Sequence, residues 1–275
     1  MLYFTEPVPE EYLAEYRLLS DELDHQLPPK ALDTNLLVAS WNLRAFGDFT
    51  DDWVAGATET PKRDKQSLLC IAEIVSRFDV IALQEVKGSL RALRHILRLL
   101  GPHWSFSMTD VTRGQPGNDE RMAFLFDTRK LQLAGLACEL VLPAEKLQPG
   151  GTEAIDKQFA RTPYAVSFRT VGHTFILVTL HVLYGDVPAE RAPELKAIAE
   201  WLADWARNAY EGESNLIALG DFNIDRQDDA RYQAFTSTGL FIPEDLQRVP
   251  RTLFSDPEKP NLSKLYDQIA WFPQV

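Results

Sequence analysis

The segment NLIALGDFNIDR, residues 215–226, contains an apolar run that stops at a glycine and is followed by polar residues. The apolar residues 216–219 predict a strand that is buried on both faces, because no polar residue alternates with them. Asp221 and Asn223 follow two positions apart, so their side chains would point the same way if the backbone stays extended. Packing alone does not require a carboxylate and an amide at the end of a core strand, so the pair indicates a functional site.

Other predicted strands also carry a polar residue at or near one end. They are Asn42 in residues 35–47, Glu85 in 79–86, His181 in a hairpin over 162–185 that turns at Val171–His173, and Asp267 in 265–272. Taken singly, such residues most often make turns, face water or have their hydrogen bonds satisfied by neighbouring groups. Strand ends on one edge of a sheet converge, however, and ligand sites of layered folds gather where loops meet that edge. We therefore expect one site, in which a few oxygen ligands would suit Mg²⁺ and a histidine would titrate near neutral pH.

Helices and a second hairpin are predicted between these strands. A helix over residues 60–78 would have Thr60 as its cap. Residues 85–101 contain another helix, capped by Ser89 and ended by Gly101. The remaining elements are a helix over 188–210, a hairpin over 121–142 that turns at Asp127–Lys130, and a long surface loop over 143–160.

The first thirty residues form a separate predicted element. They lack the charged-then-apolar plan of a secretory signal, and no apolar run in the chain approaches the roughly 20 residues of a membrane span. We expect one amphipathic helix that packs on the main domain, and a partner-binding arm is the alternative. Its apolar face would carry Tyr12, Leu13, Tyr16, Leu19 and Leu23, and Pro28 and Pro29 would end it.

The composition is that of a globular protein with a full core. The chain has 275 residues, of which 45% are hydrophobic, and no domain linker is evident. The two cysteines, Cys70 and Cys138, lie in apolar contexts without metal-ligand spacing, which argues against a zinc site. Since no export signal is recognised, we expect a cytoplasmic protein.

The net charge of −12 argues against indiscriminate binding of nucleic acid by the whole surface. A local basic strip remains compatible with it. Lys87 precedes the helix predicted within residues 85–101, and Arg91, Arg94 and Arg98 share one of its faces. This face is either simply solvated or directed at phosphates.

Five motifs occur in an order and spacing that carry a resemblance, and they read SWNLRAFG, DVIALQEV, TLHVLYG, LGDFN and YDQIAWF. Over residues 35–275 the chain resembles the endonuclease/exonuclease/phosphatase superfamily, and most of all its pancreatic-type deoxyribonuclease branch. The resemblance implies an α/β (α+β) fold, a four-layer α/β sandwich of two packed mixed β-sheets flanked by helices. Residues 1–30 would be an N-terminal helical extension and residues 31–275 the family domain.

The resemblance also implies a role for each matching residue. Glu85 and Asn42 would bind the metal, which is Mg²⁺ with Mn²⁺ as a substitute. His181 would act as general acid, and Glu120 would orient it. The scissile phosphate and the attacking water would be engaged by Asp221 and Asn223, the substrate phosphate by Arg161, and the nucleic acid by Arg44 and Lys87.

One departure from the family pattern concerns Asp267, which matches an acid that pairs with a histidine in a following Ser-Asp-His motif. The sequence ends at Val275, eight residues after Asp267, and contains no such motif. We expect that the sequence is a fragment that lacks the final strand and this histidine, so that Asp267 lines the cleft beside an unpaired strand edge. Gln268, where relatives often have histidine or arginine, is a smaller departure.

The resulting functional prediction is a Mg²⁺-dependent phosphodiesterase of nucleic acid, a deoxyribonuclease-like endonuclease with DNA as the expected partner. One alternative is a phosphatase or phosphodiesterase of small-molecule or lipid phosphates. Another is a catalytically impaired member that binds phosphate or nucleic acid without turnover.

Overall fold

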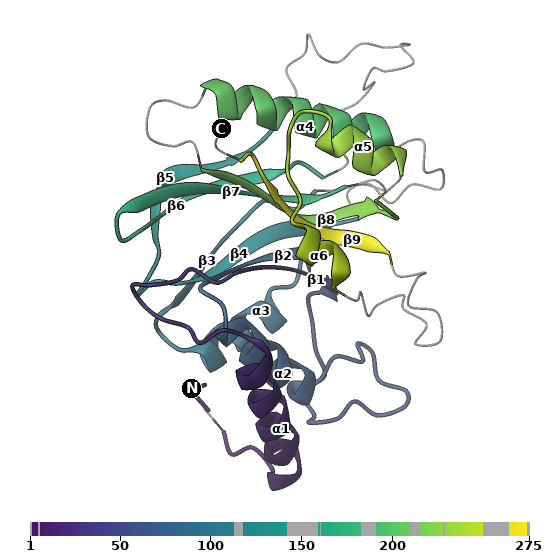
Figure 1. Ribbon diagram of the computed structural model, residues 1–275. Coiled ribbons are helices and arrows are strands. Elements are labelled where there is room, and N and C mark those ends of the chain that lie inside the picture. Colours follow the sequence, from purple (N-terminus) through teal and green to yellow (C-terminus); the bar gives the residue numbers. More distant parts are fainter. Residues whose placement is uncertain are drawn as a thin grey trace.

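The described strands form two β-sheets that pack face to face (Figure 1). The computed structural model describes residues 2–4, 6–112, 118–141, 159, 161–182, 191–208, 215–227, 229–249 and 264–273. The first sheet has the order β1 (Val38–Phe46), β2 (Val80–Lys87), β4 (Glu120–Asp127) and β3 (Trp104–Met108). The second sheet has the order β5 (Gln132–Glu139), β6 (Tyr164–Thr170), β7 (His173–His181), β8 (Leu216–Ile224) and β9 (Leu265–Trp271).

Helices cover the outer face of each sheet, which confirms the predicted four-layer sandwich (Figure 1). The first sheet is covered by α2 (Lys65–Ser76) and α3 (Arg91–Leu100), and the second by α4 (Arg191–Asn208) and α5 (Ala230–Thr236). A short helix, α6 (Glu244–Arg248), contacts β9. Both sheets are mixed, because β1 runs parallel to β2 and β7 parallel to β8, while the other pairs are antiparallel.

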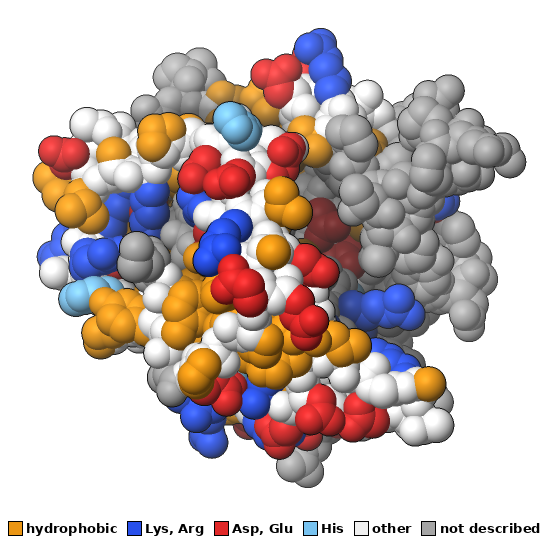
Figure 2. Space-filling view, turned by 90° about the horizontal axis from the view of Figure 1, so that it is seen from below, with side chains coloured by type: hydrophobic (Ala, Val, Ile, Leu, Met, Phe, Trp, Pro, Cys, Tyr) orange, Lys and Arg blue, Asp and Glu red, His pale blue; other side chains and the backbone are white. Residues whose placement is uncertain are grey.

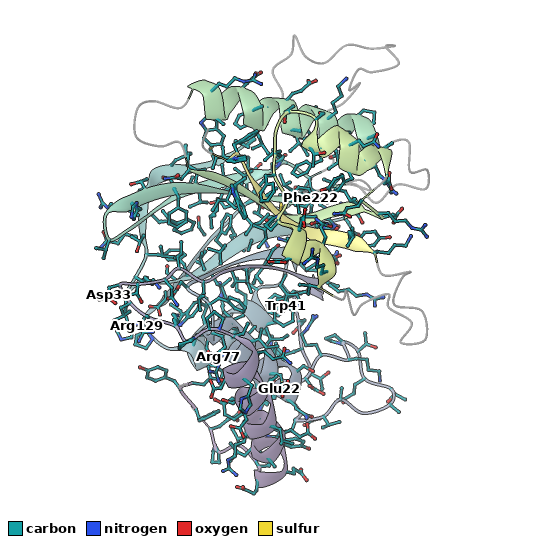
Figure 3. All side chains as sticks on the ribbon, in the orientation of Figure 1. Glu22, Asp33, Trp41, Arg77, Arg129 and Phe222 are labelled. Carbon is teal, nitrogen blue, oxygen red and sulfur yellow. The ribbon has the colours of Figure 1, made fainter. Side chains whose placement is uncertain are left out.

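The central strands are apolar on both faces because they lie between the other sheet and a helix layer. Between the sheets, Phe124 of β4 packs on Phe168 of β6, with ring centroids 5.7 Å apart. On the outer face of the second sheet, Phe222 packs edge-on against Phe235 of α5 at 4.5 Å. Trp41 belongs to the cluster on the outer face of the first sheet, and Figure 3 shows it on the opposite side of the sandwich from Phe222.

The predicted hairpin over 162–185 is confirmed, whereas the hairpin over 121–142 is wrong. β6 and β7 pair antiparallel around the turn at Val171–Gly172. β4, however, pairs with β2 and β3 in the first sheet, and β5 pairs with β6 in the second. The residues after Asp127 therefore carry the chain from one sheet to the other. Alternation of apolar residues predicts a strand but not the strand with which it pairs.

Two helices begin later than the sequence predicted. Asp64, not Thr60, is the cap of α2, and its side chain accepts a hydrogen bond from the backbone N–H of Ser67 at 2.8 Å. At α3, Leu90 takes the cap position and Ser89 Oγ lies 3.4 Å from the N–H of Arg91. The predicted segments 143–160 and 188–190 lie outside the described residues, apart from Phe159.

The N-terminal helix α1 (Glu10–Gln26) packs on α2, as expected, through contacts that are largely polar. The hydroxyl of Tyr16 donates to Glu73 at 2.8 Å, and the ring of Tyr12 stacks on Trp53 at 5.4 Å. No residue of α1 is fully buried. Its outer side carries acidic side chains, which are seen from below in Figure 2. In the part of the chain that the structure describes, no helix is both long and apolar enough to cross a lipid bilayer.

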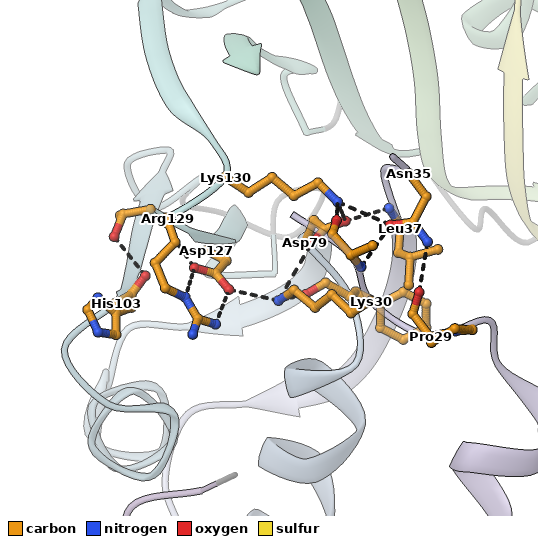
Figure 4. A network of polar contacts seen from close by, with 12 residues as sticks. Pro29, Lys30, Asn35, Leu37, Asp79, His103, Asp127, Arg129 and Lys130 are labelled. Carbon is orange, nitrogen blue, oxygen red and sulfur yellow. Dashed lines mark hydrogen bonds and ion pairs between the residues drawn. The ribbon is translucent and has the colours of Figure 1, made fainter. Parts of the chain in front are cut away.

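A buried ionic network joins the end of the N-terminal extension to the first sheet (Figure 4). Asp79 and Asp127 are fully buried. Lys130 Nζ lies 2.8 Å from Asp79 Oδ2, and Lys30 Nζ lies 2.9 Å from Asp127 Oδ2. Burial alone would raise the pKa of Asp127, but hydrogen bonds from Arg129 and Lys30 hold it well below its usual range. Asp127 is therefore charged in the folded protein, and each of the two buried carboxylates has a lysine beside it.

Replacing Lys130 by methionine should destabilise the protein by about 3–5 kcal/mol, because it leaves the buried charge of Asp79 undercompensated. Urea unfolding of the wild type and the Lys130→Met variant would measure the difference. The matched control is Arg17→Gln, whose exposed pair with Glu10 should contribute less than about 1 kcal/mol. Equal stabilities of the two variants would contradict the importance of the network.

Candidate active site

Three strands are irregular at the same end of the sandwich, and their irregularities aim polar side chains at one place. The pairing register shifts between Asn42 and Phe46 in β1, between Leu83 and Val86 in β2, and between Asp221 and Ile224 in β8. Such β-bulges bend a strand and redirect its side chains. Non-glycine residues with positive φ occur at the same places, namely Arg44, Ala45, Glu85 and Asn223, with φ of 45°, 52°, 60° and 50°. Backbone strain of this kind typically persists where the surrounding structure enforces it, often at functional sites.

Gly220 allows the central strands of the second sheet to approach closely next to these residues. Its φ is +146°, and a Cβ at this position would lie 2.0 Å from the carbonyl oxygen of Leu180. Only glycine fits both conditions. The glycine thus sets His181 of β7 and Asp221 of β8 side by side in the parallel register.

Asn42 connects the two sheets at this end. Its Nδ2 lies 2.9 Å from Oε1 of Glu85 in the first sheet and 3.0 Å from Oδ2 of Asp221 in the second. The other oxygen of Glu85 accepts the backbone N–H of Ala45 at 2.9 Å. The structure therefore brings together Asn42 and Glu85, the residues proposed to bind the metal.

The donor set around Asn42 fits a hard divalent cation. Glu85 and Asp221 offer carboxylate oxygens and Asn42 a side-chain carbonyl oxygen, and both carboxylates contact the same Asn42 amide group. Magnesium typically takes one or two carboxylates and completes its shell with water and substrate phosphate. Within the described residues, no group of three or more histidine, cysteine, aspartate or glutamate side chains is placed to hold a metal ion.

His181 lies between two carboxylates and is almost completely buried. Its Nδ1 is 3.4 Å from Oε2 of Glu120, and its Nε2 is 3.9 Å from Oδ2 of Asp221. Glu120, on the first sheet, is thus placed to orient the imidazole. The other ring nitrogen, Nε2, faces the carboxylate of Asp221. The structure therefore places His181 beside Glu120, as the sequence predicted.

Glu120 also holds two of the predicted substrate-binding cations. Lys87 Nζ lies 2.9 Å from its Oε1, and Arg161 Nε lies 2.8 Å from its Oε2. Burial raises the pKa of Glu120, but hydrogen bonds from His181 and Lys87 and the charge of Arg161 lower it to about 2. Nη1 of Arg161 is buried and has no hydrogen-bond partner in the described part of the chain, so this donor remains available.

The other predicted residues lie at the same end with different orientations. Arg44 is exposed at the rim, and its backbone N–H donates to Asn42 Oδ1 at 2.9 Å. Asn223 donates through Nδ2 to the carbonyl of Val182 at 2.7 Å, and its positive φ interrupts the regular alternation expected after Asp221. Asp267 faces Asp221 in the β8–β9 register.

The Gln268 side chain is turned away from these carboxylates. It is buried, donates to the carbonyl of Leu265 at 2.7 Å and accepts from Gln247 of α6 at 3.2 Å. Among the described strands, β1 and β9 each lie at one edge of their sheet, and Trp271 of β9 makes an isolated bridge to Phe241.

Sequence reasoning missed a buried polar bridge directly beneath the site. Gln84 is fully buried, and its Nε2 donates to the hydroxyl of Thr179 on the second sheet at 3.0 Å and to that of Ser40 at 3.2 Å. Each of these residues lies one or two positions before a site residue on its own strand. The detectable signal was a glutamine directly after the apolar run VIAL, residues 80–83.

Three arginines that were also missed bind the carbonyls of the irregular segments. Arg63 donates to the carbonyl oxygens of Leu43, Arg44 and Ala45 at 2.6–3.1 Å. Arg121 donates to those of Lys87 and Gly88 at 3.1 and 3.2 Å, and Arg231 to that of Asn223 at 3.4 Å. An arginine thus donates hydrogen bonds to backbone carbonyls in or next to each irregular segment of the site.

Comparison with known proteins agrees with this geometry. The model of the endonuclease/exonuclease/phosphatase family matches residues 39–257. The chain belongs to this family. The match includes the strands that carry Asn42, Glu85, His181 and Asp221, whose individual roles remain predictions.

Curated relatives of this family member include deoxyribonucleases. A protein named deoxyribonuclease from Thioalkalivibrio sp. (strain K90mix) is 31% identical over 206 residues, which are 72% of this chain and 49% of that protein. Deoxyribonuclease-1 of Bos taurus is 25% identical over 201 residues, covering 70% of this chain and 62% of the relative. The chain thus matches about half to two thirds of the length of these relatives.

A solved structure with the same fold is the mannosyl-6-phosphatase Bt3783 of Bacteroides thetaiotaomicron VPI-5482. Its TM-score is 0.60 at 20% identity, and the match covers 87% of this chain and 86% of that one. At this identity the likeness establishes the fold alone.

The low pKa of Glu120 predicts a pH-dependent contribution to stability. Because the pKa falls from 4.5 to about 2 on folding, the charged form stabilises the folded state above about pH 4.5, and this contribution disappears as the pH falls toward 2. The shift corresponds to a free energy on the order of 3 kcal/mol. The stability difference between wild type and Glu120→Gln should therefore shrink as the pH decreases.

Urea unfolding at several pH values would measure this difference. The control is Glu10→Gln at an exposed pair, for which the difference should stay small at every pH. A difference for Glu120→Gln that does not change between about pH 6 and pH 2 would contradict the assigned electrostatics.

Proposed function

We propose that this chain is a metal-dependent phosphodiesterase that hydrolyses nucleic acid, with DNA as its substrate. One observation carries the proposal: Asn42 joins Glu85 of one sheet to Asp221 of the other, beside the buried His181–Glu120 pair. The deoxyribonuclease relatives support nucleic acid as the substrate class.

The residues of the site meet the requirements of phosphodiester hydrolysis. A hard divalent cation, Mg²⁺ or Mn²⁺, held by Glu85 and Asn42, would polarise a phosphoryl oxygen. Nη1 of Arg161, which has no hydrogen-bond partner among the described residues, is a donor for a non-bridging oxygen of the phosphate. Asp221 is a hydrogen-bond acceptor for the attacking water. Asp267, which faces Asp221 in the β8–β9 register, adds a second carboxylate to this region.

His181 would transfer the proton to the leaving oxygen. Its Nδ1 faces Glu120, which fixes the orientation of the ring and leaves Nε2 toward the position of the substrate. Lys87 contributes to this arrangement through Glu120, whereas the exposed Arg44 is placed to meet the nucleic acid at the rim. Asn223 would hold the end of β7, and thereby His181, through its bond to the carbonyl of Val182.

A second candidate is a phosphatase or phosphodiesterase of small molecules. The observation in its favour is the acidic character of the protein, with a net charge of −12, together with the fold shared with a mannosyl-6-phosphatase. A third is a member that binds phosphate or nucleic acid without turnover. Supercoiled plasmid, oligonucleotides and phosphorylated sugars, each incubated with Mg²⁺ or with EDTA, separate the three.

Hydrolysis of DNA should stop in EDTA and return when Mg²⁺ or Mn²⁺ is added. The Glu85→Gln variant should need more metal for half-maximal activity, because it removes a charge from a hard-cation site. Titration of activity against metal concentration would measure this change. Undiminished activity in EDTA would contradict the metal requirement.

Replacing His181 by alanine should lower turnover by about 10²–10⁴-fold, the usual contribution of general acid catalysis. Plasmid nicking followed over time would measure the rate. The matched control is His173→Ala, at the exposed turn between β6 and β7, which should leave the rate unchanged. Near-normal turnover of His181→Ala would identify His181 as a structural residue.

A further inference from the structure

The outer side of α3 carries three arginines close to the candidate active site. The helix follows β2, the strand of Glu85, after a connection of only a few residues. Leu93 and Ile96 are buried against the first sheet, so the opposite side of the helix faces solvent. Arg91, Arg94 and Arg98 are exposed on that side, at the spacing that aligns residues along a helix.

Two of these arginines have no charge partner among the residues that the structure describes. Arg91 pairs with Asp48 at 2.8 Å and Asp51 at 2.5 Å and lies over the ring of Phe49. Within the described residues, neither Arg94 nor Arg98 forms an ion pair with a carboxylate. In a chain with a net charge of −12, this pair makes a local positive potential that is attractive to a polyanion.

The same arginines border a hollow on the surface of the helix. Its volume is about 650 Å³, and Ser89, Leu90, Arg91, Arg94, Leu97 and Arg98 line it. The leucines offer apolar contact, the serine a hydroxyl, and the guanidinium groups bidentate donors for phosphate oxygens. A sugar–phosphate backbone has matching chemistry, with apolar sugar faces between anionic phosphates.

The loop after β1 links the rim of the site to the start of α3. The N–H of Ala92 donates to the carbonyl of Gly47 at 3.1 Å, and a Cβ at Gly47 would lie 2.8 Å from Cβ of Lys87. The loop that follows Arg44 therefore packs directly on the start of α3. A strand of nucleic acid that leaves the site past Arg44 would meet the arginines next.

We propose that the hollow on α3, with Arg94 and Arg98, binds the sugar–phosphate backbone of nucleic acid beside the scissile position. The inference rests on the proposed function, since it names a second contact of the same substrate. Arg94 and Arg98 are separated by about 6 Å along the helix, which corresponds to on the order of two phosphates of one duplex strand. The acidic outer side of α1 cannot serve as this surface, because it would repel phosphate (Figure 2).

The test measures binding rather than cleavage. Fluorescence anisotropy in EDTA, with a labelled duplex of about 24 base pairs, gives the affinity between about 50 and 200 mM salt. The Arg94→Gln/Arg98→Gln variant should lose up to two phosphate contacts, so its salt slope should fall by about 2. Over this salt range the advantage of the wild type should shrink by about tenfold.

Two further variants make the result specific. Arg17→Gln/Arg207→Gln changes the net charge equally at exposed positions on α1 and α4 and should keep the wild-type slope. Arg94→Lys/Arg98→Lys keeps the charge and should retain most of the slope. If both glutamine variants lose affinity equally, only net charge matters and the assigned surface is overturned.

The remaining outcomes separate the inference from the proposed function. A wild-type protein that shows no salt-dependent binding of DNA overturns the nucleic-acid function and, with it, the surface on α3. Wild-type binding with the same salt slope in Arg94→Gln/Arg98→Gln overturns the surface alone. In that case the arginines are free for an acidic protein partner.

Discussion

The amide of Asn42 donates to one carboxylate from each β-sheet, and the geometry of the candidate site depends on this contact. The two sheets pack mainly through apolar side chains, and polar contacts cross between them at this end. Gln84 makes a second such contact below it, through the hydroxyl of Thr179. These two contacts hold Glu85 and His181, which belong to different sheets, in one site. If either contact were lost, buried polar groups would be left without a hydrogen-bond partner.

The strain of the site is balanced by cations that bind backbone carbonyls. Arg63 contacts the irregular segment of β1, and Arg231 contacts that of β8. Residues with positive φ cost of order 1–3 kcal/mol each, and they persist only if their surroundings fix them. The arginines provide this support through hydrogen bonds to the backbone carbonyls. As a result, the fixed backbone of a strand, and not a flexible loop, sets the direction of side chains such as Glu85.

The family resemblance predicted the layers of the fold, and local patterns in the sequence predicted the gathering of Asn42, Glu85, His181 and Asp221 at one end. Apolar runs and turn residues are local signals, and strand ends converge whichever way the strands pair. The hairpin over 121–142 was wrong because pairing partners are chosen by long-range packing. The start of α2 was misplaced because Thr60 and Asp64 are both good caps, and only the surrounding loop selects between them. The support from Gln84 and Arg63 has no motif, since it is defined by contacts between distant segments.

The ionic network at Lys30 has a consequence for how the protein unfolds. Lys30 belongs to the N-terminal extension, yet its charge is needed by Asp127 in the first sheet, and Lys130 bonds back to the carbonyl of Ala31. Separating the extension from the sheet would therefore take Lys30 away from the buried Asp127 and leave Arg129 as its cationic partner. A boundary near residue 30 is natural in the sequence, yet an ion pair with a fully buried carboxylate crosses it. A protein shortened at that boundary would carry a buried carboxylate that has lost one of its two cations.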